Sequence, residues 1–111
     1  MELVVVMITA GSAAEAGAIG DALLEAKLVA CVNLLEGVRS LYWWRGEREA
    51  SDECLLIAKT RRELFDKVVE VVRSLHSYEV FEAVALPIVE CAREYGDWIR
   101  ETTVPGPADE S

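Results

Sequence analysis

The order in which two hydrophobic patterns alternate along the chain constrains its fold more than any other feature. Short apolar runs rich in β-branched residues predict strands, and segments with apolar residues every three or four positions predict amphipathic helices. Strands are predicted at residues 3–9, 29–44, 54–60 and 80–89, helices at 12–28 and 60–76, and a short last helix around Tyr95, Trp98 and Ile99. This order predicts an α+β, ferredoxin-like βαββαβ sandwich with an extra C-terminal helix, in which both main helices cover one face of an antiparallel sheet.

Local signals mark the ends and irregularities of these elements. Ser12 with Glu15, and Thr60 with Glu63, have the spacing of a capping box and predict the starts of the two main helices. Gly37 predicts a bend or bulge in the second strand, and Pro87 places the fourth strand at an edge or a bulge. Gly17 and Gly20 each cost the first helix roughly 1 kcal/mol relative to Ala, and are expected to allow close packing there.

The length of 111 residues, 52% of them hydrophobic, predicts one domain. We assign it to residues 1–103, followed by a flexible C-terminal tail at 104–111 that contains two prolines. No apolar run reaches the roughly 18 residues that span a bilayer, and the first residues lack the pattern of a signal peptide. A cytoplasmic location is therefore expected.

The charge balance restricts the partners. Eleven basic residues against twenty acidic ones give a formal charge of −9, which disfavours nucleic acid and anionic membranes. The balance is compatible with cations, although an acidic surface also simply keeps a protein soluble. Three widely spaced cysteines without a C-x-x-C pair indicate neither a disulfide framework nor a structural zinc site.

Tyr42, Trp43 and Trp44 stand in series near the end of the second predicted strand. In the usual strand order this strand lies at a sheet edge, where a long apolar strand invites pairing with another chain. Alternation sends Trp43 to one face and its neighbours to the other, so both faces need apolar cover. This predicts a homo-oligomer in which the hairpin extends the sheet of a neighbour; the alternative is a ligand groove.

Several strings, which together run from the second strand to the last helix, resemble the CutA family. They are A-C-V-N at 30–33, Y-W-W-R-G-E at 42–47, L-L-I-A-K-T-R at 55–61, H-S-Y-E at 76–79, A-L-P-I-V at 85–89, and Tyr95 with Trp98 and Ile99. The resemblance implies a trimer built like the PII signalling proteins and a link to tolerance of copper and other divalent cations. The family pattern has proline at Ser77 and again near Phe81, and their loss predicts a looser approach to the fourth strand.

Two residues are the main candidates for a metal site. His76, the only histidine, is a good ligand for copper, nickel or zinc, but it also ends a helix, where a protonated imidazole would be stabilised by the dipole. Cys31 lies in the A-C-V-N strand and offers a soft thiolate for Cu(I) or Zn, unless it is a small buried hydrophobe. Glu79, and less directly Glu82, could add oxygen ligands. The other two cysteines are expected to be packing residues: Cys54 and Cys91.

Lys59 is a charged residue in an apolar strand, and burying it requires a partner. Glu79 and Glu82 are the candidates, with Tyr78 able to form a hydrogen bond nearby. The arrangement predicts an interchain salt bridge, or alternatively a polar cleft between subunits that holds a small anionic ligand. Together with the aromatic series at 42–44, Lys59 and Tyr78 are the predicted interface residues.

Two functions remain open at this point. The first is a homotrimeric cytosolic protein that binds copper or zinc through Cys31, His76 and Glu79 and supports metal tolerance. The second is a PII-like signalling or scaffold trimer that binds a small metabolite or a protein in clefts between subunits. An enzyme is not expected, because a Cys31–His76 dyad would lack an orienting residue and an oxyanion loop. No organic cofactor is expected.

Overall fold

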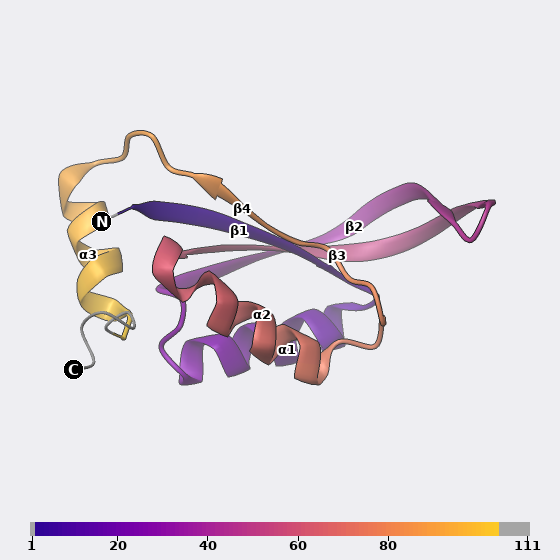
Figure 1. The fold of residues 1–111 in the computed structure, drawn as a ribbon, viewed down its shortest axis with the longest axis horizontal. Helices are drawn as coiled ribbons and strands as arrows, with labels where there is room; N and C mark the ends of the chain where they lie inside the picture. Colours follow the sequence, from indigo (N-terminus) through magenta and orange to yellow (C-terminus); the bar gives the residue numbers. More distant parts are fainter. Residues whose placement is uncertain (1, 105–111) are drawn as a thin grey trace.

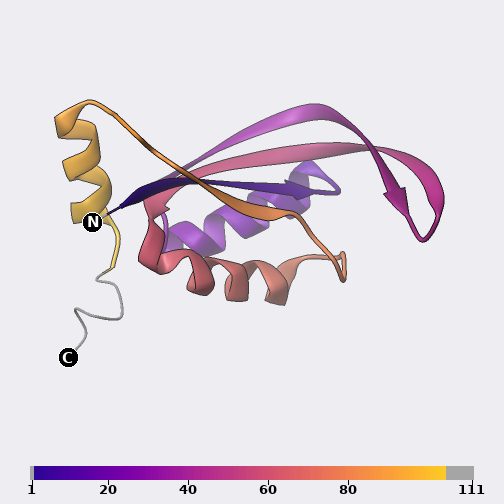
Figure 2. The same cartoon turned by 45° about the horizontal axis from the view of Figure 1, so that its top comes forward.

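A computed structural model describes residues 2–104 and confirms the predicted order of elements. The strands are β1 (Leu3–Ala10), β2 (Cys31–Trp44), β3 (Glu47–Arg61) and β4 (Ala83–Pro87), and the helices are α1 (Ala13–Glu25), the 3-10 turn η1 (Arg62–Leu64), α2 (Phe65–Leu75) and α3 (Arg93–Thr102). The strands form one antiparallel sheet in the order β2-β3-β1-β4. α1 and α2 lie side by side on one face of this sheet, and α3 lies at its end near the N-terminus (Figure 1; Figure 2).

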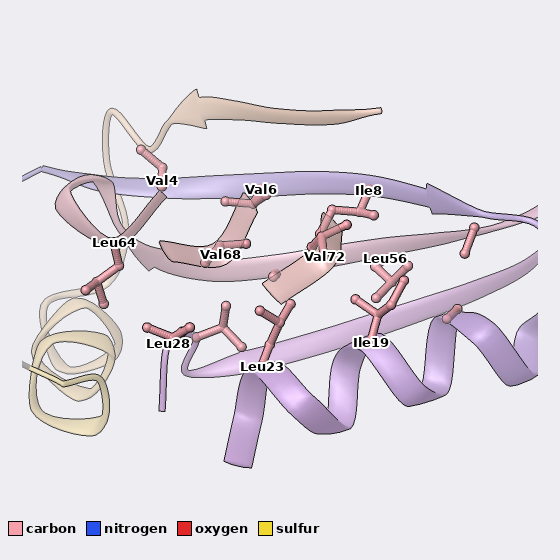
Figure 3. Packing of buried hydrophobic residues seen from close by; sticks show 14 of the residues in the cluster. Val4, Val6, Ile8, Ile19, Leu23, Leu28, Leu56, Leu64, Val68 and Val72 are labelled. Atoms are coloured by element: carbon pink, nitrogen blue, oxygen red, sulfur yellow. The ribbon is translucent and has the colours of Figure 1, made fainter. Parts of the chain in front are cut away.

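The core lies between this face and the two helices (Figure 3). Every second residue of β1 and of the second half of β3 points to the helices, which present apolar residues at helical spacing. The fully buried members include Val6, Ile8, Leu56, Ile19, Leu23, Val68 and Val72. Gly20 is buried against the sheet, but an added Cβ would lie 3.6 Å from Val32, an ordinary van der Waals contact, so this packing does not require glycine. At Gly17 nothing lies within 4 Å of the Cβ position, so no close packing occurs there either.

β2 and β3 form a hairpin that projects well beyond β1 (Figure 1; Figure 2). Its turn is the pair Arg45 and Gly46, both with positive φ (51° and 82°), as a tight two-residue hairpin loop requires. Gly37, with φ of 76°, lies in the predicted bulge, where the β2–β3 register shifts. β3 was predicted only from residue 54, but it begins at Glu47 because its polar first half pairs with β2 throughout.

Both outer strands lie where the sequence predicts. β2 and β4 are the edges of the sheet, so Pro87 lies in an edge strand. β4 is shorter than the predicted 80–89, because its pairing with β1 covers only Ala83 to Pro87. The predicted C-terminal tail begins at Val104, which donates its N–H to the Lys27 carbonyl at 2.9 Å; residues 105–111 lie outside the described residues.

The predicted capping box at Thr60 is wrong. Thr60 is still part of β3, fully buried, and its hydroxyl donates to the Leu28 carbonyl at 2.6 Å. η1 and then α2 follow without a side-chain cap. At Ser12 the prediction is confirmed, since its Oγ accepts the Glu15 N–H at 3.1 Å. α1 ends at Glu25 rather than near residue 28, because Lys27 adopts a left-handed φ of 55°.

The sheet face opposite α1 and α2 remains largely uncovered within one chain (Figure 2). α3 covers only the end of this face, where Ile99 packs on Leu3 and Ala30. The rest carries half-buried or exposed apolar side chains from all four strands: Val5, Met7, Leu35, Leu55, Ile57, Val84 and Leu86.

Candidate functional site

A groove of about 570 Å³ lies between the β2–β3 hairpin and the loop that joins α2 to β4. The hairpin contributes one wall and the loop the other, with the end of β1 between them. The lining residues are Thr9, Ser40, Leu41, Tyr42, Trp44, Glu53, Tyr78, Val80 and Glu82. Aromatic rings and carboxylates therefore share one concave surface.

Glu53 is the buried polar group of this groove, with 8% of its surface exposed. Its neighbour across the groove is Tyr78, and burial raises the pKa of that phenol, as does the Glu53 carboxylate through its charge and a hydrogen-bonding interaction. Tyr42, whose hydroxyl lies 3.4 Å from Ser51 Oγ, adds to the effect. Tyr78 is therefore a neutral hydrogen-bond donor facing a carboxylate.

His76 lies directly behind this loop, at the C-cap of α2. Its Nε2 is 2.7 Å from the Thr9 carbonyl, so this nitrogen carries the proton and donates. Its Nδ1 accepts the Tyr78 N–H at 3.0 Å, and its ring stacks on Phe81 at 5.2 Å. Both ring nitrogens of this neutral imidazole are thus engaged within the chain.

A carboxylate from α1 holds the same loop. Glu15 accepts the Gly11 N–H at 3.0 Å and the Ser77 N–H at 2.7 Å. In a capping box its side chain would accept the N–H of Ser12, so here it bonds one residue earlier in the chain. Burial would raise the pKa of Glu15, but these hydrogen bonds outweigh it and hold the pKa below its usual range. The loop is tied to β1 and α1 even though Ser77 replaces a proline of the family pattern.

Cys31 lies at the other end of the sheet, half-buried at the start of β2. Its Sγ is 3.5 Å from the hydroxyl of Tyr95 on α3. This contact, with burial and the nearby Cys91, raises the pKa of Tyr95 to about 12. Cys54 is buried in the core as predicted, whereas Cys91 is exposed.

The two main metal-ligand candidates do not meet within one chain. Cys31 pairs with Lys59 on β3, whereas His76 bonds to Thr9, which pairs with Leu55. Four residues of β3 separate these levels, or about 13 Å along the strand. Glu79 is exposed beside His76, and the described residues contain no group of three or more His, Cys, Asp or Glu that could hold a metal ion.

Lys59 does not contact the acidic residues that the sequence suggested as its partners. Its Nζ donates to Oδ1 of Asn33, the adjacent strand residue in A-C-V-N, and not to Glu79 or Glu82. Trp43 is 70% exposed and points away from the face that carries Tyr42 and Trp44, as alternation predicts.

The sequence analysis missed Glu53 as a site residue. A signal was present: Glu53, Leu55 and Ile57 alternate with buried Cys54 and Leu56, which places Glu53 on the same face as Thr9. It was missed because the polar stretch before it did not look like a strand.

The fold and the groove define a small ferredoxin-like α+β protein that leaves one sheet face and a long aromatic hairpin free for binding. The sequence matches the family "CutA1 divalent ion tolerance protein" over residues 4–102. The chain belongs to this family. None of the helices among the described residues is long and apolar enough to cross a membrane.

Known relatives cover nearly the whole chain. "Divalent-cation tolerance protein CutA" of Thermus thermophilus is 50% identical over 99 residues, which are 89% of this chain and 96% of that protein. Its solved structure has a TM-score of 0.90 at 48% identity, covering 92% and 99% of the two chains. The protein of the same name from Archaeoglobus fulgidus is 44% identical over 87% of this chain and 94% of its own.

A plant relative is longer. "Protein CutA 1, chloroplastic" of Oryza sativa is 37% identical over 90% of this chain, but the match spans only 56% of the rice protein. The solved structure of CutA1 from Oryza sativa has a TM-score of 0.92 at 35% identity, covering 96% of this chain and 97% of that one.

Proposed function

We propose that this chain assembles as a homotrimer that binds copper, or another divalent transition metal such as zinc, and supports metal tolerance in the cytoplasm. The observation that carries the proposal is the 50% identity to the Thermus thermophilus protein named for divalent-cation tolerance, across 96% of its length. The relatives carry the name of a tolerance protein, and we propose a role without catalysis.

The uncovered sheet face supports the trimer. Leu35, Val84 and Leu86 on that face are 45–49% exposed, and Leu41 and Trp43 of the hairpin are 62% and 70% exposed. Exposed apolar side chains of this extent are typical of a protein–protein contact. Burial against neighbouring copies would remove it from water, and the β2 edge can add to the sheet of another chain.

A metal site then requires residues of more than one subunit. Because Cys31 and His76 are about 13 Å apart along β3, Cys31 of one subunit would meet His76 or Glu79 of the next. Cys31 is the stronger candidate, since its thiol is half-buried and its neighbour is a neutral phenol. A metal on His76 Nδ1 must first displace the Tyr78 N–H.

The test is a titration of the reduced protein with Cu(I), Cu(II) and Zn(II), each against a chelator of known affinity. Cys31→Ser and His76→Ala are compared with Cys91→Ser, a control at an exposed thiol. We expect saturable binding at a fixed ratio per trimer that Cys31→Ser abolishes and Cys91→Ser leaves unchanged, with the assembly followed by sedimentation. Weak binding that neither Cys31→Ser nor His76→Ala alters would contradict the proposal.

The groove favours a second candidate function, a PII-like scaffold trimer that binds a small metabolite beside the hairpin. Its volume of about 570 Å³ is within the usual range for small-molecule sites. A thermal-shift screen of nucleotides and other metabolites tests this function, and it fails if no compound stabilises the protein.

A further inference from the structure

We propose that Tyr95 positions Cys31 for metal binding, because its hydroxyl donates a hydrogen bond to the Cys31 sulfur and holds that sulfur in place once the thiol has lost its proton. The inference assigns Tyr95 a role at the metal site proposed above and rests on that proposal. Tyr95 is thus a positioning residue, which acts through Cys31 and does not itself bind the metal.

The contact between the two side chains is the first argument. The Tyr95 hydroxyl lies 3.5 Å from the Cys31 Sγ, although 64 positions separate the two residues in the sequence. Lys59 pairs with Cys31 across the strands, but its ammonium donates to Oδ1 of Asn33. Among the described residues, Tyr95 is therefore the hydrogen-bonding neighbour of the Cys31 sulfur.

The packing of α3 fixes the place of the Tyr95 hydroxyl. Ile99 is fully buried and packs on Ala30, the residue directly before Cys31, so α3 is held beside the start of β2. The rings of Tyr95 and Trp98 lie 5.5 Å apart between centroids, at an angle of 37°. All these contacts lie within one chain, so they do not require a surface that the assembly leaves open.

The chemistry of the pair favours Tyr95 as the donor. A cysteine binds a metal as the thiolate, which has no proton left to donate and can only accept hydrogen bonds. A neutral phenol can donate its O–H to that sulfur, and a hydrogen bond to a charged acceptor is stronger than one to a neutral acceptor. Residues that hold a metal ligand in this way contribute about 10–100-fold to metal affinity.

The test titrates reduced wild-type protein and Tyr95→Phe with Cu(I) and Zn(II), each against a chelator of known affinity. Tyr95→Phe removes the hydroxyl and keeps the ring beside Trp98. Cys31→Ser and the double variant complete a mutant cycle, and Cys91→Ser is the control at an exposed thiol. Co(II), a coloured substitute for Zn(II), reports on the sulfur directly, because a hydrogen bond to a thiolate moves its charge-transfer band to shorter wavelength.

We expect Tyr95→Phe to weaken binding about tenfold or more and to move the Co(II) band to longer wavelength, whereas Cys91→Ser should stay within about twofold of the wild type. In the Cys31→Ser background, Tyr95→Phe should change any remaining affinity by less than about twofold, because it acts through the sulfur.

Two kinds of failure can be told apart. If Cys31→Ser abolishes binding while Tyr95→Phe changes neither affinity nor band, the inference is overturned and the metal site stands. An equal loss in both backgrounds, or a phenolate-to-metal band that Tyr95→Phe removes, would also overturn it, since Tyr95 would then act on the fold or as a ligand. Binding that Cys31→Ser does not alter would refute the proposed metal site and this inference together.

Discussion

Replacing His76 tests whether this residue acts mainly within the fold. His76→Ala removes the hydrogen bonds to the Thr9 carbonyl and the Tyr78 N–H and the stack on Phe81. Each hydrogen bond contributes about 0.5–1.5 kcal/mol, and the ring pair a similar amount. Because the imidazole is only half-buried, we expect a loss of about 2 kcal/mol in the free energy of unfolding.

The assay is urea unfolding in the presence of a metal chelator, at one fixed protein concentration because the proposed assembly would couple to stability. His76→Asn is the matched control, since its Oδ1 can replace Nδ1 as acceptor for the Tyr78 N–H but cannot reach Thr9. It should lose about half as much as His76→Ala. A loss below about 0.5 kcal/mol in His76→Ala would refute the reasoning, as would an Asn variant no better than the Ala variant.

Three further predictions concern titration and backbone geometry. Absorbance titration should find Tyr95 ionising near pH 12, and Cys31→Ala should lower the pKa of Tyr95. Because this pKa is raised in the folded state, the neutral phenol stabilises the fold below about pH 10, and this contribution is lost as pH rises through 12. The depressed pKa of Glu15 means that its stabilisation is present at neutral pH and lost on acidification, so Glu15→Gln should flatten the acid limb of a plot of stability against pH. In thermal unfolding, Gly17→Ala should stabilise α1 by about 0.5–1 kcal/mol, whereas Gly46→Ala, at φ of 82°, should destabilise the hairpin by about 1–2 kcal/mol.

The order of strands and helices was predictable because the spacing of apolar residues along the chain reflects which face of each element is buried. β1 contributes alternate residues to one core, and α1 and α2 contribute residues at helical spacing, so each pattern follows from the face that each element buries. Element ends were less predictable. Thr60 has the sequence signature of a helix cap, yet strand pairing and a hydrogen bond to Leu28 hold it in β3.

The first half of β3 shows why hairpin length escaped prediction. Residues 47–53 are polar and look like a loop, but they pair residue by residue with β2. The Arg48 guanidinium lies 5.5 Å from the Trp43 ring, and Arg39 bonds to Asp52 at 3.4 Å. Such cross-strand contacts depend on register, which a single strand does not encode.

The candidate site was predictable residue by residue, but its spatial arrangement was not. Nothing in the spacing of Cys31 and His76 indicates that they lie at opposite ends of the sheet, because that follows from the β2–β3 and β1–β3 registers. Glu53 joins Tyr78 only through the path of the α2–β4 loop. Burial and geometry of this kind require the assembled sheet.

The hairpin also affects the order in which parts of the chain can form. Its turn brings together residues close in sequence, such as Trp44 and Glu47, so closing it costs little chain entropy. The pairing of Val6 with Ala85, by contrast, must close a loop of nearly eighty residues. The hairpin that carries the most exposed tryptophan can therefore form before the sheet is complete, so the proposed contact with a second chain could begin at an early stage of folding.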